Sequence, residues 1–491
     1  ELRLEFADAL TSWGRHAEAR DLLASIVPAT AAQRDAVNSR LAEAWLAQGQ
    51  APRALELAQS ILSRDAADPV ARRVAVLACR DVGDLATAIQ VCEAADKAPG
   101  ARRPDADLGL LYLLDLRYRE AEGRLADALA STEGAARASL RTMQAIACIA
   151  QGLNDRAVGA LADARDALPA NARPGEPLLL ALGSTGADAA AAALELQSRH
   201  DRPSAAMAGW LRSVMARFAA NRELAGQALA ACVAEAQAWH TRSAELFAAA
   251  LGRAPEEPWL LYKAAEAHAR LRAFEPAVAL ARRLAAAHPK AGDAHLLLGS
   301  LLDSQGAAAE AAAAYTQALS VMDRQAPGPL LSLADRLRTI GRLDEAMEAY
   351  RAVLDAKPDH RAACQRLAWL YAAHKPDRLA EAERLATTAA GADPTDAASR
   401  DTLGWVLFLA RKPEAARGEV LAAVALDPRN ALYYYHLGMI DFVRGRRAQA
   451  RRALRVALRL DPKLADAETA RTTLKTLDGA AGALDDGFPM P

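Results

Sequence analysis

The amino-acid sequence predicts an all-α protein made of stacked helical hairpins, and three observations carry this prediction. Hydrophobic residues make up 52% of the chain but aromatic residues only 5%, so the apolar content is mostly Ala and Leu, which favour helices. Val, Ile and Thr do not form the alternating runs that are typical of β-strands. Proline recurs every 34 residues at Pro394, Pro428 and Pro462, which indicates a repeated structural unit.

Each repeat places the same residue types in the same order. Between Pro327 and Pro358, two apolar stripes at helical spacing flank Gly341, with Ala334 in the first stripe and Ala346 in the second. This pattern predicts two antiparallel helices joined by a turn at the glycine. The two alanines let the helix backbones approach closely, and the final proline stops the second helix.

The same pattern extends along most of the chain and predicts about 12 units. The small or turn residues that mark it are Gly14 with Ala19, Gly49 with Ala54, Gly83 with Ala88, Tyr112 with Ala121, Gly152 with Ala157, His268 with Ala277, Gly299 with Ala311, and Gly438 with Ala450. We therefore expect an N-terminal array over residues 1–169 and a C-terminal array over residues 258–462.

The remaining segments depart from the repeat pattern. Residues 170–257 contain several prolines and glycines and a long alanine run, so we expect degenerate helical repeats there, with a kink between two arms. Residues 463–478 predict a capping helix, which repeat arrays need for solubility, and residues 479–491 predict a flexible tail.

Composition narrows the classes of function. A net charge of −1 and a pI near 6.9 argue against a nucleic-acid-binding protein. No apolar stretch reaches the roughly 18 residues that a transmembrane helix needs. The chain begins at Glu1 rather than at Met, so we expect that an upstream segment has been removed or left out, and a lipid anchor could lie there.

The sequence carries no motif for catalysis, a cofactor or a metal. Phosphate-binding loops, H-E-x-x-H, C-x-x-C and G-x-S-x-G are all missing, so we expect a protein that is not an enzyme. Cys79, Cys92, Cys148 and Cys364 fall at small apolar positions of their units, which favours packing in the core. Cys79 and Cys92 lie on the two helices of one unit, so a disulfide between them is geometrically conceivable.

The repeats resemble the tetratricopeptide repeat (TPR), a helix-turn-helix unit of 34 residues. The resemblance implies a right-handed α-solenoid whose first helices line a concave groove for a partner protein or peptide. The inward positions of the family correspond here to Trp369, Asp401, Trp405, Phe408, Leu409, Tyr435, His436, Met439 and Phe442. Aromatic residues and Met are enriched in binding interfaces, so these side chains predict a trough that holds a helix or an extended peptide. The alternative, that some of these rings pack between repeats, stays open.

A second candidate surface is a stripe of arginines. Arg447, Arg451, Arg455 and Arg459 are spaced by four residues and fall on one face of a predicted helix. One interpretation is a solvated face that pairs with Asp466 and Glu468 of the last helix. The other is a docking site for an acidic partner, a polysaccharide or a lipid head group.

The C-terminal repeats also resemble a narrower group. The stretches LAWLYAAHKPDRLAEAERLA, DTLGWVLFLARKPEAA and YYYHLGMIDFVRGRRAQARRAL look like the end of bacterial envelope TPR proteins, including lipoproteins of exopolysaccharide export and of exosortase (PEP-CTERM) systems. This resemblance implies a periplasmic or outer-membrane-associated scaffold for polysaccharide synthesis, export or protein sorting. The alternatives are the repeat arm of a larger exporter or glycosyltransferase, and a cytoplasmic adaptor or regulator. The sequence specifies neither the partner nor the oligomeric state.

Overall fold

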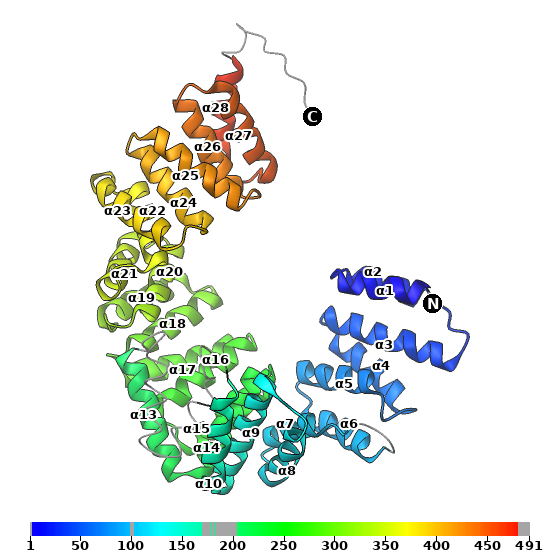
Figure 1. Cartoon of the computed structure of the whole chain (residues 1–491). Coiled ribbons are helices and arrows are strands. Elements are labelled where there is room, and N and C mark those ends of the chain that lie inside the picture. Colours follow the sequence, from blue (N-terminus) through cyan, green and yellow to red (C-terminus); the bar gives the residue numbers. More distant parts are fainter. Residues whose placement is uncertain (1, 99–102, 169–177, 179–180, 182–203, 480–491) are drawn as a thin grey trace. The chain divides into compact units, whose positions relative to one another are not determined.

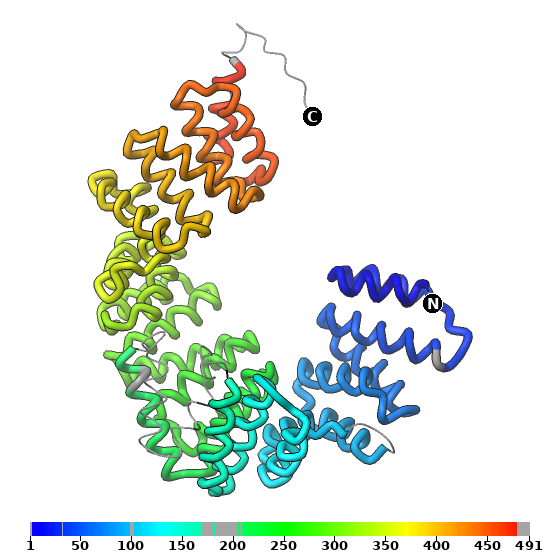
Figure 2. Tube along the Cα trace, viewed as in Figure 1, coloured from blue at the N-terminus to red at the C-terminus, as the bar shows by residue number. Residues whose placement is uncertain are grey.

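The structure, a computed structural model, describes residues 2–98, 103–168, 178, 181 and 204–479. Within these residues it contains 26 α-helices and one short 3-10 helix, and no β-strand (Figures 1 and 2). The prediction of an all-α fold is therefore confirmed. The chain divides into two compact units, residues 1–311 and residues 312–491.

The first unit holds the helices that precede α19 (Ala308–Val321). The boundary between the two units along the chain falls within α19. In chain order these are α1 (Leu2–Ser12), α2 (His16–Ala24), α3 (Ala31–Ala47), α4 (Ala51–Leu62), α5 (Pro69–Val82), α6 (Leu85–Lys97), α7 (Asp105–Leu114), α8 (Tyr118–Leu129), α9 (Gly134–Gln151), α10 (Asn154–Asp166), α13 (Ala205–Ala220), α14 (Arg222–Ala236), α15 (His240–Arg253), α16 (Pro258–Arg270), α17 (Phe274–Ala287) and α18 (Gly292–Gln305).

The second unit continues with four further hairpins and one terminal helix. They are α20 (Pro327–Thr339) with α21 (Leu343–Ala356), α22 (Arg361–His374) with α23 (Leu379–Ala392), α24 (Ala397–Leu409) with α25 (Pro413–Leu426), α26 (Ala431–Val443) with α27 (Arg447–Leu460), and α28 (Ala467–Gly479). The 3-10 turn η1 (Pro376–Arg378) joins α22 to α23. Consecutive hairpins pack side by side, as in a solenoid (Figure 1).

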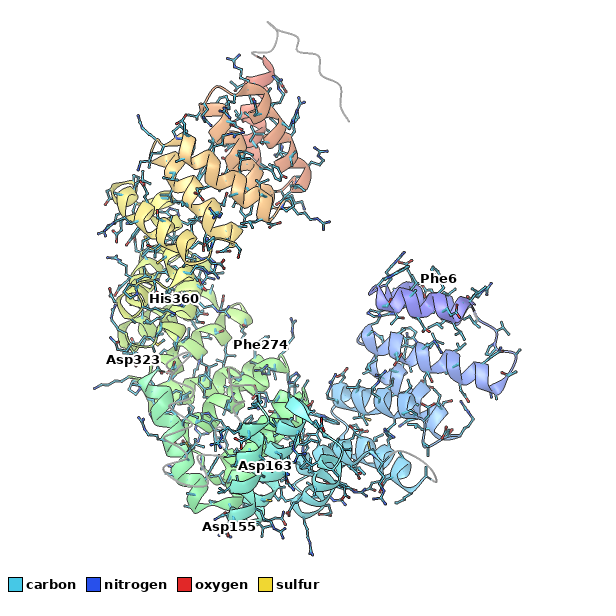
Figure 3. The ribbon with its side chains drawn as sticks, in the orientation of Figure 1. Phe6, Asp155, Asp163, Phe274, Asp323 and His360 are labelled. Carbon is cyan, nitrogen blue, oxygen red and sulfur yellow. The ribbon has the colours of Figure 1, made fainter. Side chains whose placement is uncertain are left out.

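Among the described helices, the first unit contains seven consecutive pairs, α1/α2 to α9/α10, α14/α15 and α16/α17, and the second unit contains four, α20/α21 to α26/α27. The prolines that predicted the repeat, Pro358, Pro394, Pro428 and Pro462, each lie two residues beyond the end of a second helix. Side chains at the N-termini assist the start of some first helices. The His360 ring, for example, accepts a hydrogen bond from the Ala363 amide in the first turn of α22 (Figure 3).

The turn inside most hairpins contains a left-handed residue, the exception being α22/α23, where the 3-10 turn η1 joins the helices. Gly341 and Gly445 fill this position with φ values of 80° and 72°, which glycine adopts without steric cost. In the α24/α25 hairpin the equivalent residue is Arg411, with a φ of 59°. The turn geometry is therefore kept even where the glycine that marks it in the sequence is replaced.

The segment that fitted the repeat pattern poorly differs from the rest in burial. All residues from Leu224 to Ala234 of α14 are buried, because α14 contacts α9, α13 and α15. A helix that is covered on every side has no amphipathic period, so its repeat phase could not be read from the sequence. The structure joins its two units at residues 311 and 312, which is downstream of the expected kink. The expected boundaries at residues 169 and 257 stay predictions, and residues 169–177, 179–180 and 182–203 lie outside the described part of the chain.

The last helix closes the hydrophobic core of the final repeat. Ala470 and Leu477 of α28 are buried in one cluster with Tyr435 of α26 and Leu454 of α27. The helix therefore has the predicted capping position, although it begins at Ala467 rather than at residue 463. The expected flexible tail, residues 479–491, lies outside the described residues from position 480 onward.

Candidate partner-binding surface

Close contact between paired helices determines where the side chains of the second unit point. A Cβ atom added at Gly438 would lie 2.6 Å from Cγ of Leu454, and one added at Gly404 would overlap Val420. The two helices of the α24/α25 and α26/α27 hairpins touch at these glycines, so the larger side chains of each first helix lie to either side of this contact. Tyr435 of α26, for example, is buried in one cluster with Leu454 of α27 and Leu477 of α28.

A series of polar contacts links each first helix of the second unit to the next one. Asp335 of α20 forms an ion pair with Arg366 of α22. The amide nitrogen of Gln365 in α22 donates to the hydroxyl of Thr402 in α24 at 3.0 Å. Asp401 of α24 in turn contacts His436 of α26. We call these three contacts the inter-repeat ladder; because each crosses from one repeat to the next, they fix the spacing of the first helices.

The last contact of this ladder is a buried pair stacked on an indole ring. Nδ1 of His436 lies 2.8 Å from Oδ1 and 3.0 Å from Oδ2 of Asp401, and both residues are 4% exposed. An ionised carboxylate only accepts hydrogen bonds, so Nδ1 carries the proton and donates it. The ring of Trp405 stacks on His436 with centroids 4.1 Å apart and planes inclined by 20°.

The burial of this pair corrects part of the predicted trough. Asp401, His436 and Tyr435 are all buried, so their side chains are not available at the surface. Asp401 and Tyr435 are the fifth residues of α24 and α26, and His436 is the sixth residue of α26. These two positions face the adjacent first helix, which explains why residues expected to face a ligand instead join neighbouring repeats. Burial raises the pKa of the Tyr435 phenol to about 12.

The other predicted residues reach the surface to different extents. Trp369 is 40% exposed and Leu409 is 37% exposed, whereas Trp405, Phe408, Met439 and Phe442 are half-buried. Trp369, Trp405 and Met439 are the ninth residues of α22, α24 and α26, so they share one side of three successive repeats. We call the set of Trp369, Trp405, Phe408, Leu409, Met439 and Phe442 the apolar row. Within it, the rings of Trp405 and Phe408 have centroids 5.1 Å apart.

The capping helix covers the C-terminal end of the apolar row. Met439 and Phe442 pack against the core cluster that contains Leu477 of α28. The hydroxyl of Thr473, which is also in α28, lies 3.8 Å from the sulfur of Met439. The exposed part of the row is consequently centred on Trp369, Phe408 and Leu409.

The arginine stripe has an acidic partner that the sequence analysis did not name. The guanidinium groups of Arg451 and Arg455 lie 2.8 and 3.5 Å from the carboxylate of Asp478. Glu468, which was one expected partner, lies instead 3.3 Å from Arg471 in its own helix. Arg447 and Arg459 are exposed, and no ion pair forms at either of them among the described residues. The stripe is thus partly neutralised by the end of the capping helix.

The cysteines lie in the core. Cys79, Cys92, Cys148 and Cys364 are free thiols, and all four are buried. The conceivable bridge between Cys79 and Cys92 is therefore not formed in this structure. Burial raises the pKa of both thiols to about 12, so they stay protonated at neutral pH.

The part of the chain that the structure describes shows neither a metal-ligand cluster nor a membrane-spanning helix. In residues 2–98, 103–168, 178, 181 and 204–479, His, Cys, Asp and Glu nowhere gather in threes with the geometry of a metal site. Over the same residues, no helix combines the length and the hydropathy that a bilayer-spanning segment requires.

The fold and this surface define a helical-repeat protein. Within that class, family models of the tetratricopeptide repeat match residues 262–328, 330–360 and 402–465, so these segments are TPR repeats. The matched segments include α26 and residues 402–409 of α24, which carry much of the apolar row. No curated protein has significant similarity to the chain.

Several solved structures have a low overall similarity to this chain. A chain of the APC/C hetero-tetramer Cut9-Hcn1 is 14% identical, with 96% of this chain and 95% of that chain covered and a TM-score of 0.37. YrrB, described as a TPR protein with an unusual peptide-binding site, is 18% identical over 39% of this chain and 96% of its own, with a TM-score of 0.34. TTC0263, a thermophilic TPR protein of Thermus thermophilus, is 23% identical over 38% of this chain and 99% of its own, with a TM-score of 0.31. At these TM-scores the likenesses carry no information on function.

Proposed function

We propose that this protein is a non-catalytic scaffold that binds a peptide or a protein segment along the apolar row. The observation that supports the proposal is the exposure of Trp369 and Leu409 beside the Trp405–Phe408 ring pair on adjacent first helices. Aromatic side chains in such a cluster commonly dominate the energy of a binding interface. A Trp that is 40% exposed can still bury much of its ring against a ligand.

The inter-repeat ladder prepares this surface for binding. Ion pairs and hydrogen bonds beneath the apolar row hold α20, α22, α24 and α26 in a fixed arrangement before a ligand arrives. A preorganised surface loses little conformational entropy on binding, so more of the contact energy appears as affinity. A helix or an extended segment with apolar side chains suits the part of the row that stays exposed on α22 and α24, centred on Trp369, Phe408 and Leu409.

We further propose that the scaffold works in a bacterial envelope assembly for polysaccharide synthesis, export or protein sorting, in the periplasm or at the outer membrane. Support for this setting comes from the resemblance of the C-terminal stretches to envelope TPR proteins. Fractionation of the native host tests it, because an envelope protein is released with the periplasm or the outer membrane. Recovery with the cytosol would contradict the setting and would leave the binding proposal intact.

The binding proposal is tested with peptides selected on the purified chain from a random library. Trp369→Ala should weaken the selected peptides by about 30-fold, which corresponds to an interface residue worth about 2 kcal/mol. The matched control is Trp13→Ala, because Trp13 is 65% exposed and lies next to α1, far from the apolar row in the sequence. Equal loss in both variants, or no loss in Trp369→Ala, would contradict the proposal.

A further inference from the structure

A pocket of about 400 Å³ lies in the last two hairpins of the chain, α24/α25 and α26/α27. Its walls come from α25 and α27, the second helices of those hairpins, and its base comes from α26. Leu421, Leu437 and Val456 supply its apolar lining, and Arg417, Gln449 and Arg452 supply polar groups. The volume falls within the range of about 300–1,000 Å³ that is common for ligand pockets.

The base of the pocket is built on a buried ion pair. Asp441 of α26 is 1% exposed, and Nε of Arg417 lies 2.7 Å from its Oδ1 atom. This pair crosses from one hairpin to the next and fixes the Arg417 side chain against the pocket wall. The charge of Arg417 is matched by Asp441, so the pair contributes little net charge to the site.

The mouth of the pocket is positively charged. Arg452 is exposed and forms no ion pair among the described residues, and α27 contains five arginines and no acidic residue. The carboxylates of α25 do not compensate this charge, because Glu414 lies 3.2 Å from Arg444 and Glu419 lies 2.7 Å from Arg400. A ligand with a carboxylate next to an apolar group would match both the mouth and the lining.

We propose that this pocket binds an acidic peptide segment, with one apolar side chain inserted between Leu421 and Val456 and a carboxylate against Arg452. A peptide fits better than the other anions considered for the arginine stripe. A polysaccharide has no aliphatic side chain to place against Leu421, Leu437 and Val456. A lipid head group would leave the same apolar lining unfilled.

This pocket shares no lining residue with the apolar row, so each proposal can fail without the other. The probes are three fluorescein-labelled peptide pools of equal length. The first pool mixes Glu and Leu, the second replaces Leu by Ser, and the third replaces Glu by Lys. Fluorescence anisotropy on the full chain should show the tightest binding for the Glu–Leu pool, with affinity falling as salt is raised.

Variants on one helix distinguish the pocket from diffuse charge. Arg452→Gln should weaken the Glu–Leu pool about tenfold, the expected loss for one charge-assisted hydrogen bond. Ala448→Trp, at an exposed position of the pocket lining, should weaken it at least as much by filling the space. Arg459→Gln removes the same charge from the same helix outside the pocket lining and should change the affinity less than about twofold. Circular dichroism confirms that each variant is folded.

Four results would overturn the proposal. The first is equal weakening by Arg452→Gln and Arg459→Gln, which indicates attraction to the whole helix. The second is equal binding of the Glu–Leu and Glu–Ser pools, which removes the role of the apolar lining. The third is that none of the three pools binds. The fourth is that phosphatidylglycerol vesicles or alginate bind, that Ala448→Trp abolishes this binding, and that the Glu–Leu pool does not bind. The site would then belong to another class of ligand.

Discussion

Replacement of Gly404 by alanine should destabilise the α24/α25 hairpin, although alanine is the better helix former. The added Cβ would overlap Val420 and would lie 3.0 Å from the carbonyl oxygen of Ala416 and 3.2 Å from the amide nitrogen of Val420. Two of these atoms belong to the backbone, so they cannot rotate away. Overpacking of this kind costs about 1–3 kcal/mol, whereas the gain in helix propensity is about 1 kcal/mol. We therefore expect a net loss of up to about 2 kcal/mol in the free energy of unfolding.

Gly418, in α25 of the same hairpin, provides the control. A Cβ atom added there meets nothing within 4 Å, so Gly418→Ala should stabilise the protein by about 0.5–1 kcal/mol. Urea denaturation followed by circular dichroism, with hydrogen exchange of the α24 and α25 amides, measures both changes. Stabilisation by Gly404→Ala would refute the close helix contact on which the description of the hairpin rests.

Two predictions concern ionisable groups in the first unit. A hydrogen bond from Arg124 lowers the pKa of Asp96, so this contact stabilises the fold above the ordinary carboxyl pKa of about 4 and is lost as the pH falls through the lower folded value. The difference in unfolding free energy between the native protein and Arg124→Gln, measured by urea titration, should accordingly shrink below about pH 4. A difference that stays constant from about pH 7 to pH 3 would contradict this assignment. Burial raises the pKa of Cys79 and Cys92 to about 12, so both thiols should resist a thiol reagent at about pH 8 until urea unfolds the chain. Mass spectrometry would contradict this if it found the two cysteines linked in the native protein.

The hairpins were predictable from the sequence because their signals are local. Proline fixes the end of a second helix, and a small residue such as Gly438 is needed wherever two helix backbones touch. Both constraints act within one repeat, so one sequence reveals them. The non-glycine turn at Arg411 shows the limit, because the surrounding helices impose the left-handed conformation there.

The candidate surface was predicted less completely because it depends on contacts between repeats. Positions that the TPR resemblance placed in the groove divide into buried residues and residues that are exposed or half-buried in the apolar row. Asp401 and Trp405 are only one helical turn apart. Which of them is covered depends on the residue that the next repeat presents, such as the His436 ring beneath Trp405. Asp478 was missed as a partner of Arg451 for the same reason, since its distance from α27 follows from how α28 docks.

Binding of library-selected peptides to the Trp369→Ala and Trp13→Ala variants tests the central claim most directly. If the apolar row is the binding surface, the first variant should lose about 30-fold in affinity and the second should keep its affinity, with the helical content of both unchanged. Selected peptides that bind the two variants equally well would show that the surface centred on Trp369 does not hold the ligand.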